Sequence, residues 1–279
     1  MRADPHAHPP ALVAGLLDTL AVPLARRRGR ALLVGLSGLQ GSGKSTLARQ
    51  LAAAAHTRAI ACCLLALDDF YLGRRARAAL ARTIHPLLAT RGVPGTHDTA
   101  LLAHTLAALA HASERAPVRV PRFDKGRDTR LPPSRWARVR RPPQLILLEG
   151  WCVGVPPQAG GALRRPLNAL ERDCDPQAVW RRYVNARLAS DYAALWQRLD
   201  RLVLLQAPDF ACARRWRAQA EQALRQQGAP RAMAPRELER FMQHYERLSR
   251  HALATLPARA DLCVQLDHAR RTTRIPAGP

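Results

Sequence analysis

A phosphate-binding loop is the feature that most constrains what this chain can fold into. Residues 38–46 read Gly-Leu-Gln-Gly-Ser-Gly-Lys-Ser-Thr and fit the pattern G-x-x-x-x-G-K-[ST], which cradles nucleotide phosphates. The apolar residues 31–36 predict a buried strand before the loop, and the alanine- and leucine-rich residues 45–55 predict a helix after it. A strand, a phosphate loop and a helix in this order predict a nucleotide-binding α/β sheet.

The loop also predicts which atoms meet the nucleotide. Its glycines let backbone N–H groups face phosphate oxygens, and the helix N-terminus adds the positive end of a dipole. We expect Lys44 to act in catalysis near the β- and γ-phosphates of ATP, and the Ser45 hydroxyl to bind Mg²⁺. The predicted nucleotide-binding residues of the loop are Gly38, Gly41, Ser42, Gly43, Lys44, Ser45 and Thr46.

The basic residues are almost all arginine. Of 44 lysines and arginines, only Lys44 and Lys125 are lysine, which leaves 42 arginines. A compact ammonium differs physically from a planar guanidinium, so a lysine in such a chain indicates a place that arginine does not suit. Because Lys44 lies in the phosphate loop, Lys125 becomes a second candidate site residue.

The formal net charge of +23 is compatible with a polyanionic partner such as nucleic acid. The arginines are spread along the whole chain, however, without interleaved aromatic residues or a recognisable nucleic-acid-binding module. We therefore expect non-specific association with polyanions at low salt and no specific nucleic-acid function.

Other features predict the compartment. No apolar run approaches the roughly 20 residues that span a bilayer, and residues 1–6 do not open an apolar signal segment. The six cysteines show no metal-binding spacing, so reduced thiols are expected. These features predict a cytoplasmic protein without a membrane partner. The sequence does not predict the oligomeric state.

The remaining pattern alternates apolar strands with helices, which predicts a parallel, doubly wound α/β sheet. Residues 73–98 look broken, residues 118–123 look extended, and the proline- and arginine-rich residues 126–143 predict a mobile loop. Further strands are predicted at 59–67, 144–148, 202–205 and 262–266, and helices at 10–28, 99–112, 175–198, 208–226 and 235–251.

Acidic residues follow two of the predicted strands. Ligands bind beyond the carboxyl ends of such strands, so these carboxylates are expected near the phosphate loop. Glu149 suits Mg²⁺ binding, because a carboxylate at a buried strand end needs a cation or a donor. Asp68 is the preferred general base or acceptor-orienting group, and Asp69 is the second candidate.

At these residues the chain resembles the D-glycerate 3-kinases, within the uridine kinase, pantothenate kinase and phosphoribulokinase group of P-loop kinases. The marks shared across the group are residues 38–46, the D-x-F-Y pattern at 68–71 and Leu-Glu-Gly at 148–150. More specific to glycerate kinases are R-G-x-P-G-T-H-D at 91–98, P-R-F-D-K at 121–125, E-G-W at 149–151 and W-R-x-Q-A-E at 216–221.

The resemblance implies transfer of the γ-phosphate of ATP to a hydroxyl of D-glycerate, giving 3-phosphoglycerate, with Asp68 as the catalytic aspartate. It implies a P-loop NTPase-type sheet with helical lid elements. The pattern of residues itself predicts an N-terminal helical extension over 1–30 and a single kinase domain over 31–279. Lid arginines Arg214 and Arg217 are expected on the ATP phosphates. The candidate substrate-binding residues are Tyr71, Arg91, Gly95, His97, Asp98, Arg122 and Lys125.

Three alternatives stay open at this point. A kinase of the same group with a nucleoside or pantothenate as acceptor shares the general marks, although a base would favour aromatic stacking and aromatics are only 5% of the chain. A regulatory P-loop ATPase or GTPase is the second alternative, without the N-K-x-D guanine motif. A basic nucleic-acid-associated protein with a vestigial loop is the third.

Overall fold

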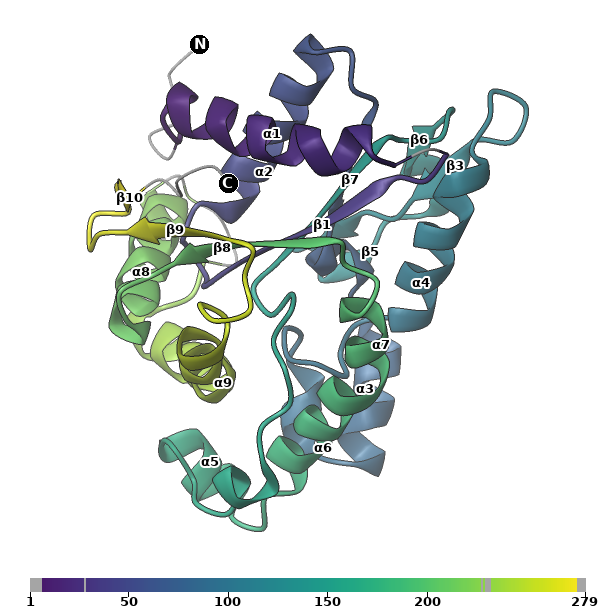
Figure 1. Cartoon of the computed structure of the whole chain (residues 1–279). Helices are drawn as coiled ribbons and strands as arrows, with labels where there is room; N and C mark the ends of the chain where they lie inside the picture. Colours follow the sequence, from purple (N-terminus) through teal and green to yellow (C-terminus); the bar gives the residue numbers. More distant parts are fainter. Residues whose placement is uncertain (1–6, 28, 227, 229–231, 275–279) are drawn as a thin grey trace.

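A six-stranded sheet forms the centre of the computed structural model, which describes residues 7–27, 29–226, 228 and 232–274 (Figure 1). The strand order is β10-β9-β8-β1-β7-β2, and every neighbouring pair is parallel except β10 with β9. The predicted parallel α/β sheet is thus confirmed, with an antiparallel edge strand that the sequence pattern missed. The strands are β1 (Leu32–Gly38), β2 (Cys62–Ala66), β7 (Leu145–Gly150), β8 (Arg201–Gln206), β9 (Leu262–Leu266) and β10 (Thr272–Arg274).

Helices cover both faces of this sheet (Figure 1). On one face, α1 (Pro10–Ala25) and α2 (Lys44–Thr57) pack against each other and the strands. On the other face lie α4 (Thr99–Ala108), η3 (Leu109–His111) and α7 (Ala193–Trp196). Helices on both faces explain why β1 and β7 are buried along their whole length.

Leucines and a valine at helical spacing hold α1 to the core. Its buried residues are Leu12, Val13, Leu16, Leu17 and Leu20. The helix ends at Ala25, earlier than the predicted residue 28, which itself lies outside the described residues, as do residues 1–6. The domain boundary at residue 30 stays a prediction.

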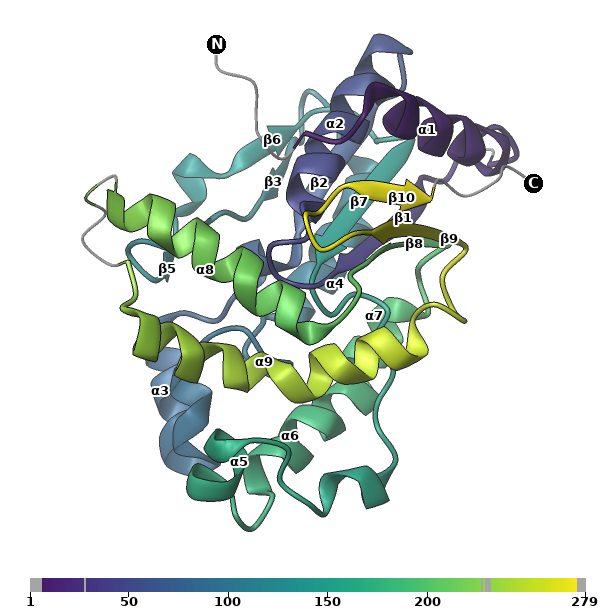
Figure 2. The same cartoon turned by 90° about the vertical axis from the view of Figure 1, so that its left-hand side faces the viewer.

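Two long helices, α8 (Phe210–Gln226) and α9 (Pro235–Thr255), run side by side beyond β8 and β9 (Figure 2). Asp209 caps α8, because its Oδ1 accepts the backbone N–H of Cys212 at 2.7 Å. Both helices were predicted from the sequence, each opening near a proline.

A small helical layer stands away from the sheet, and the sequence predicted it only in part (Figures 1 and 2). Residues 73–98, predicted as broken, contain α3 (Arg74–Thr83) and η2 (Pro86–Ala89). The predicted helix 175–198 begins only at Val179, because Asp175 is buried and accepts the N–H groups of Trp180 and Arg181. The layer also holds α5 (Ala169–Cys174), α6 (Val179–Arg187) and the π-helical turn Leu188–Tyr192, with η5 (Gly160–Leu163) leading in.

Residues 126–143, predicted as a mobile loop, contribute strands to two small two-stranded sheets. Strand β4 (Phe123–Asp124) pairs with β5 (Thr129–Arg130), and β3 (Val118–Val120) pairs with β6 (Ala137–Val139). The short helix η4 (Pro133–Arg135) joins them. The β4–β5 hairpin carries Lys125 at its turn.

No helix in the described part of the chain is both long enough and apolar enough to cross a bilayer. All six cysteines are free thiols, as the sequence predicted.

Candidate active site

Three chain segments meet at the carboxyl edge of the sheet. The phosphate loop follows β1, the short helix η1 (Leu67–Phe70) follows β2, and Glu149 lies near the end of β7. In the sheet register, Glu149 stands opposite Leu36 of β1 and Ala66 of β2. The fold therefore gathers the predicted phosphate loop, Asp68 and Glu149 at one edge, where ligands bind in parallel α/β sheets.

The phosphate loop holds polar atoms that lack partners in the described part of the chain. The Ser42 hydroxyl and both side-chain polar atoms of Gln40 are buried without a hydrogen-bond partner among the described residues. Gly43, with φ of +87°, opens α2 without a side-chain cap. Unpaired buried polar atoms are costly, and the hydroxyl of Ser42 and the side-chain amide N–H groups of Gln40 can donate to a bound anion such as the phosphates of ATP.

Helix α8 lies directly on this loop. A Cβ placed at Gly41, whose φ is +77°, would approach the Cβ of Trp216 to 2.7 Å. Glycine is therefore needed both for the backbone conformation and for the close approach. Trp216 is 1% exposed, and its indole N–H donates to the carbonyl of His268. This packing brings Arg217, the next residue of α8, beside the phosphate loop.

The two predicted metal ligands, Ser45 and Glu149, lie next to each other. The Ser45 hydroxyl donates to Oε1 of Glu149 at 2.7 Å. Burial raises the pKa of Glu149, while the charge of Lys44 opposes the rise. Hydroxyl and carboxylate oxygens are ligands that Mg²⁺ prefers, and a divalent cation would offset the burial of this carboxylate. The residues therefore fit Mg²⁺.

Asp68 is held by two donors. Lys125 Nζ lies 2.6 Å from its Oδ2, and the Tyr71 hydroxyl donates to its Oδ1 at 2.8 Å. Burial alone would raise the pKa of Asp68, but the ammonium of Lys125, its hydrogen bond and the charge of Lys44 together hold that pKa well below its usual range. Asp68 is thus a carboxylate at neutral pH.

Asp69 has a different environment. Its Oδ2 accepts Arg122 Nη1 at 2.7 Å, and its Oδ1 accepts the N–H of Phe123 at 2.9 Å. Both oxygens are therefore used to fasten the β4–β5 hairpin to η1. Of the two candidate bases, the geometry favours Asp68.

The motif at 91–98 runs antiparallel to the residues after η1. Tyr71 and His97 form an isolated bridge, and the N–H of Leu72 donates to the carbonyl of Thr96 at 2.9 Å. The rings of Tyr71 and His97 stack with centroids 4.6 Å apart. Backbone pairing thus brings two motifs that are distant in the sequence to the same wall of the site.

His97 is a buried, neutral imidazole. Its Nδ1 lies 2.6 Å from the hydroxyl of Tyr192, while its Nε2 is buried without a partner among the described residues. Burial lowers the pKa of His97 to about 4, against the opposing charge of Asp68. An unpaired buried ring nitrogen beside Tyr71 leaves a polar contact open to a ligand.

Gly95 and Asp98 are used within the protein. A Cβ at Gly95, whose φ is +93°, would lie 2.6 Å from Cε1 of Tyr183. Oδ1 of Asp98 caps α4 through the N–H of Leu101 at 3.0 Å, and its Oδ2 pairs with Arg130 at 3.1 Å. Direct contact of these two residues with substrate stays a prediction.

The predicted substrate- and phosphate-binding arginines are engaged in ion pairs. Arg91 pairs with Asp128 at 2.5 Å, and Arg77 reaches the same carboxylate at 2.5 Å. On α8, the exposed Arg214 pairs with Glu239 of α9 at 2.9 Å, so the structure does not bring it to the phosphate loop. Arg217 pairs within its own helix with Glu221.

Sequence reasoning did not single out Tyr245 or assign a role to Asp128. The hydroxyl of Tyr245, on α9, donates to the carbonyl of Arg91 at 3.0 Å, and its ring packs edge-on against Trp151. Burial, reinforced by the charge of Asp68, raises the pKa of Tyr245. Asp128 lies three residues after Lys125, and that proximity was the one available signal for it.

The site has the parts of a P-loop kinase at one edge of the sheet. These parts are a phosphate loop, a serine–glutamate oxygen pair and an ionised aspartate. Comparison with solved structures agrees on the fold. A D-glycerate 3-kinase from Cryptococcus neoformans superposes with a TM-score of 0.79 at 22% identity, over 96% of this chain and 99% of that one. No family model matches the chain.

Comparison with related sequences narrows the class of P-loop kinase to which this chain belongs. An uncharacterised kinase of Schizosaccharomyces pombe, mug58, is 34% identical over 225 residues, which cover 78% of this chain and 79% of the relative. The chloroplastic D-glycerate 3-kinase of Arabidopsis thaliana is 33% identical over 234 residues, covering 81% of this chain and 49% of the relative. The chain belongs to the same kinase family as mug58 and is an ATP-dependent phosphotransferase, and it is similar to about half the length of the Arabidopsis D-glycerate 3-kinase.

Proposed function

We propose that this kinase transfers the γ-phosphate of ATP to a hydroxyl of D-glycerate, giving 3-phosphoglycerate. One observation carries the proposal: Lys125 Nζ lies 2.6 Å from Oδ2 of Asp68, beside the phosphate loop. The pair offers a carboxylate that can orient a hydroxyl and an ammonium that can receive the carboxylate of a small hydroxy acid. The relative named D-glycerate 3-kinase supports the choice of acid.

On the nucleotide side, the amides of residues 38–46 and the start of α2 hold the phosphates of ATP. Lys44 places its charge on the β- and γ-phosphates, and Arg217 adds charge from α8. Ser45 and Glu149 would hold Mg²⁺, which supplies positive charge to the phosphate oxygens when bound.

On the acceptor side, Asp68 accepts a hydrogen bond from the attacking hydroxyl of glycerate. The glycerate oxygen forms a bond to the γ-phosphorus as the bond from that phosphorus to the bridging oxygen of ADP breaks. The hydroxyl proton passes to Asp68 and then to solvent. Tyr71 keeps Asp68 oriented through its 2.8 Å hydrogen bond during the transfer.

Lys125 suits a carboxylate better than the neighbouring arginines do. Arg91 and Arg122 are engaged with Asp128 and Asp69, and moving either would break an ion pair to a partly buried carboxylate. Lys125 has a side chain that is 60% exposed on a flexible stem. It can contact the acid group of glycerate while staying near Asp68, which an arginine fork would do less well.

A base-binding pocket fits the same wall poorly. Tyr71 and His97 stack on each other and are 4% exposed each, so their faces are not open to a nucleobase. This packing favours a small acid over a nucleoside as acceptor.

A coupled assay of ATP consumption tests the proposal. The purified chain, with Mg²⁺, is given D-glycerate, L-glycerate, uridine, pantothenate or no acceptor. We expect ATP consumption that depends on D-glycerate and stays near the acceptor-free rate with uridine and pantothenate. Turnover with uridine or pantothenate but not with glycerate would contradict the proposed acceptor while leaving the kinase class intact.

A further inference from the structure

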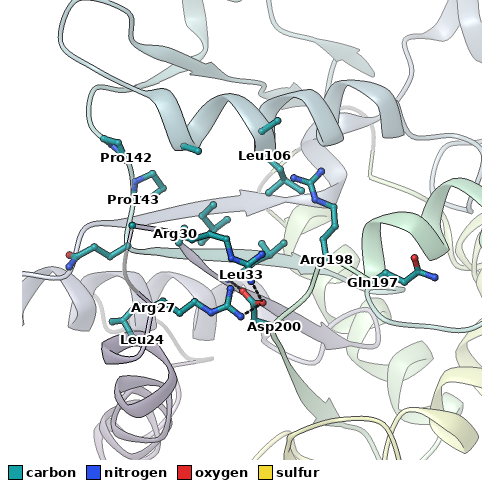
Figure 3. A pocket seen from close by; sticks show the side chains of 16 residues that line it. Leu24, Arg27, Arg30, Leu33, Leu106, Pro142, Pro143, Gln197, Arg198 and Asp200 are labelled. Carbon is teal, nitrogen blue, oxygen red and sulfur yellow. Dashed lines mark hydrogen bonds and ion pairs between the residues drawn. The ribbon is translucent and has the colours of Figure 1, made fainter.

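A cavity lies at the opposite edge of the sheet from the phosphate loop. It has a volume of about 640 Å³ and is framed by the starts of β1 and β7, the end of α1, one side of α4 and the segment after α7. Figure 3 shows α4 above this hollow and the sheet edge below it. A cavity of this size accommodates a small organic molecule. None of the residues assigned above to the kinase reaction lines it.

The floor of this cavity is apolar. Leu33 of β1, Ile146 of β7 and Leu106 of α4 line it, each packed into the core that underlies α4. Pro142 and Pro143 form the wall before β7 (Figure 3). A ligand for this cavity therefore needs an apolar body, because a fully polar molecule would lose its hydration against these side chains.

The rim is basic. Arg27, Arg30 and Arg198 line the cavity, and Asp200 is the one acidic residue among its lining residues. Asp200 already accepts the N–H of Leu33 at 2.8 Å together with the guanidinium groups of Arg27 and Arg30 (Figure 3). A single carboxylate cannot balance three guanidinium groups, so the rim keeps a net positive charge.

Two of these arginines can receive an anion. The side chain of Arg30 is 69% exposed, and among the described residues its one ion pair is a 3.1 Å contact with Asp200, which Arg27 shares. Arg198 donates to the carbonyl of Ala103 at 3.3 Å and pairs with no carboxylate of the described residues. Guanidinium groups bind carboxylate, sulfonate and phosphate oxygens strongly, especially beside apolar surface.

We propose that this cavity binds a small organic anion, with its apolar body over Leu33 and Ile146 and its acid group on Arg30 and Arg198. This site is separate from the kinase site, and its occupancy does not depend on which acceptor the enzyme uses.

The test uses the full chain with saturating ATP and Mg²⁺, which keeps the nucleotide site filled. The probe is 8-anilino-1-naphthalenesulfonate, which joins an aromatic body to one sulfonate. Its neutral counterpart is N-phenyl-1-naphthylamine, which has the same body without the charge. Fluorescence titration measures the affinity of each probe, and we expect one saturable site for the sulfonate.

Three variants then locate the site. Arg198→Ala should weaken sulfonate binding about tenfold, the effect of one charge-assisted hydrogen bond, and change binding of the neutral probe less than about twofold. Ala107→Trp, on the exposed side of α4 that lines the cavity, should fill the space and weaken both probes. His104→Trp, exposed on the same helix outside the cavity lining, is the matched control and should change neither.

Kinase activity and thermal unfolding verify that each variant is folded. Sulfonate binding of unchanged strength in both Arg198→Ala and Ala107→Trp, or no saturable binding to the unaltered chain, would overturn the proposal.

Discussion

The two halves of the active site differ in how their polar groups are satisfied. On the nucleotide side, Ser42 and Gln40 carry buried atoms without partners in the described protein, and α2 opens without a side-chain cap. On the acceptor side, Asp68 and Asp69 each have two donors. The phosphate loop therefore keeps donors available for a ligand, whereas both acceptor-side aspartates are already paired.

This difference indicates where ligand binding supplies missing contacts and where it must exchange existing ones. ATP adds hydrogen bonds to groups that have none. A hydroxy acid instead has to share Lys125 with Asp68, which Lys125 already contacts. Arginines on the acceptor side, such as Arg91 and Arg122, then hold the hairpin and the 91–98 motif in place.

The largest loss of turnover is expected from a substitution on the nucleotide side of the active site. Lys44→Ala should lower kcat about 100- to 1000-fold, because it removes a charge aimed at the transferring phosphate. Thermal unfolding should stay near that of the unaltered chain. The coupled assay measures kcat, and a thermal melt measures the unfolding temperature. A variant that keeps more than about a tenth of its turnover would remove Lys44 from the proposed role.

A paired substitution separates the two aspartates of the acceptor side. Asp68→Asn should lower kcat about 100-fold with little change in the KM for ATP, because it removes the group that orients the hydroxyl and takes its proton. Loss of ATP affinity instead would move Asp68 to the metal site.

Asp69→Asn should act on stability more than on turnover. The lost ion pair with Arg122 is worth about 1–2 kcal/mol, which lowers the unfolding temperature by roughly 2–4 °C in a chain of this size. The reverse pattern, with Asp69→Asn inactive and stable, would make Asp69 the base.

Substitution of Lys125, which lies between the nucleotide and acceptor halves of the site, should change the pH dependence of kcat/KM. Its ammonium lowers the pKa of Asp68, so Lys125→Met should let that pKa rise toward its usual value. Because Asp68 acts as a carboxylate, the acidic limb of kcat/KM should move to higher pH. The KM for D-glycerate should rise about tenfold or more as the acid loses its cation.

Lys125→Arg is the matched control for charge. It should keep the acidic limb of kcat/KM near its original pH but raise the KM for D-glycerate, because the guanidinium is larger and planar. Unchanged kinetics in both variants would make Lys125 incidental.

The smallest effect is expected at Tyr71. Tyr71→Phe removes one hydrogen bond to Asp68, worth about 0.5–1.5 kcal/mol, and should lower kcat by about 2- to 10-fold. Steady-state kinetics at saturating ATP measure it. A larger loss than in Asp68→Asn would mean that Tyr71 contacts the substrate directly.

The nucleotide half could be predicted because its residues are contiguous. Residues 31–57 contain strand, loop and helix in one local pattern, and Glu149 directly follows an apolar run. The strand ends then coincide because parallel strands share one edge. By contrast, α3 was missed because it is short and four of its ten residues are arginine, and β10 because it is only three residues long.

The acceptor half could be predicted only as a set of residues, not as a set of contacts. Lys125 meets Asp68 across 57 positions of sequence, and Arg91 meets Asp128 across 37. Such pairings depend on how the β4–β5 hairpin docks on η1, which no local pattern encodes. Sequence therefore indicated Arg91 and Arg122 as substrate contacts, while the structure pairs both with aspartates.

The most direct test of the central claim is ³¹P NMR of the product formed from ATP, Mg²⁺ and D-glycerate. Our account predicts that the resonance of 3-phosphoglycerate grows as that of the γ-phosphate declines, and that Asp68→Asn slows both together. Release of inorganic phosphate alone, with no phosphorylated acid at any time, would contradict it.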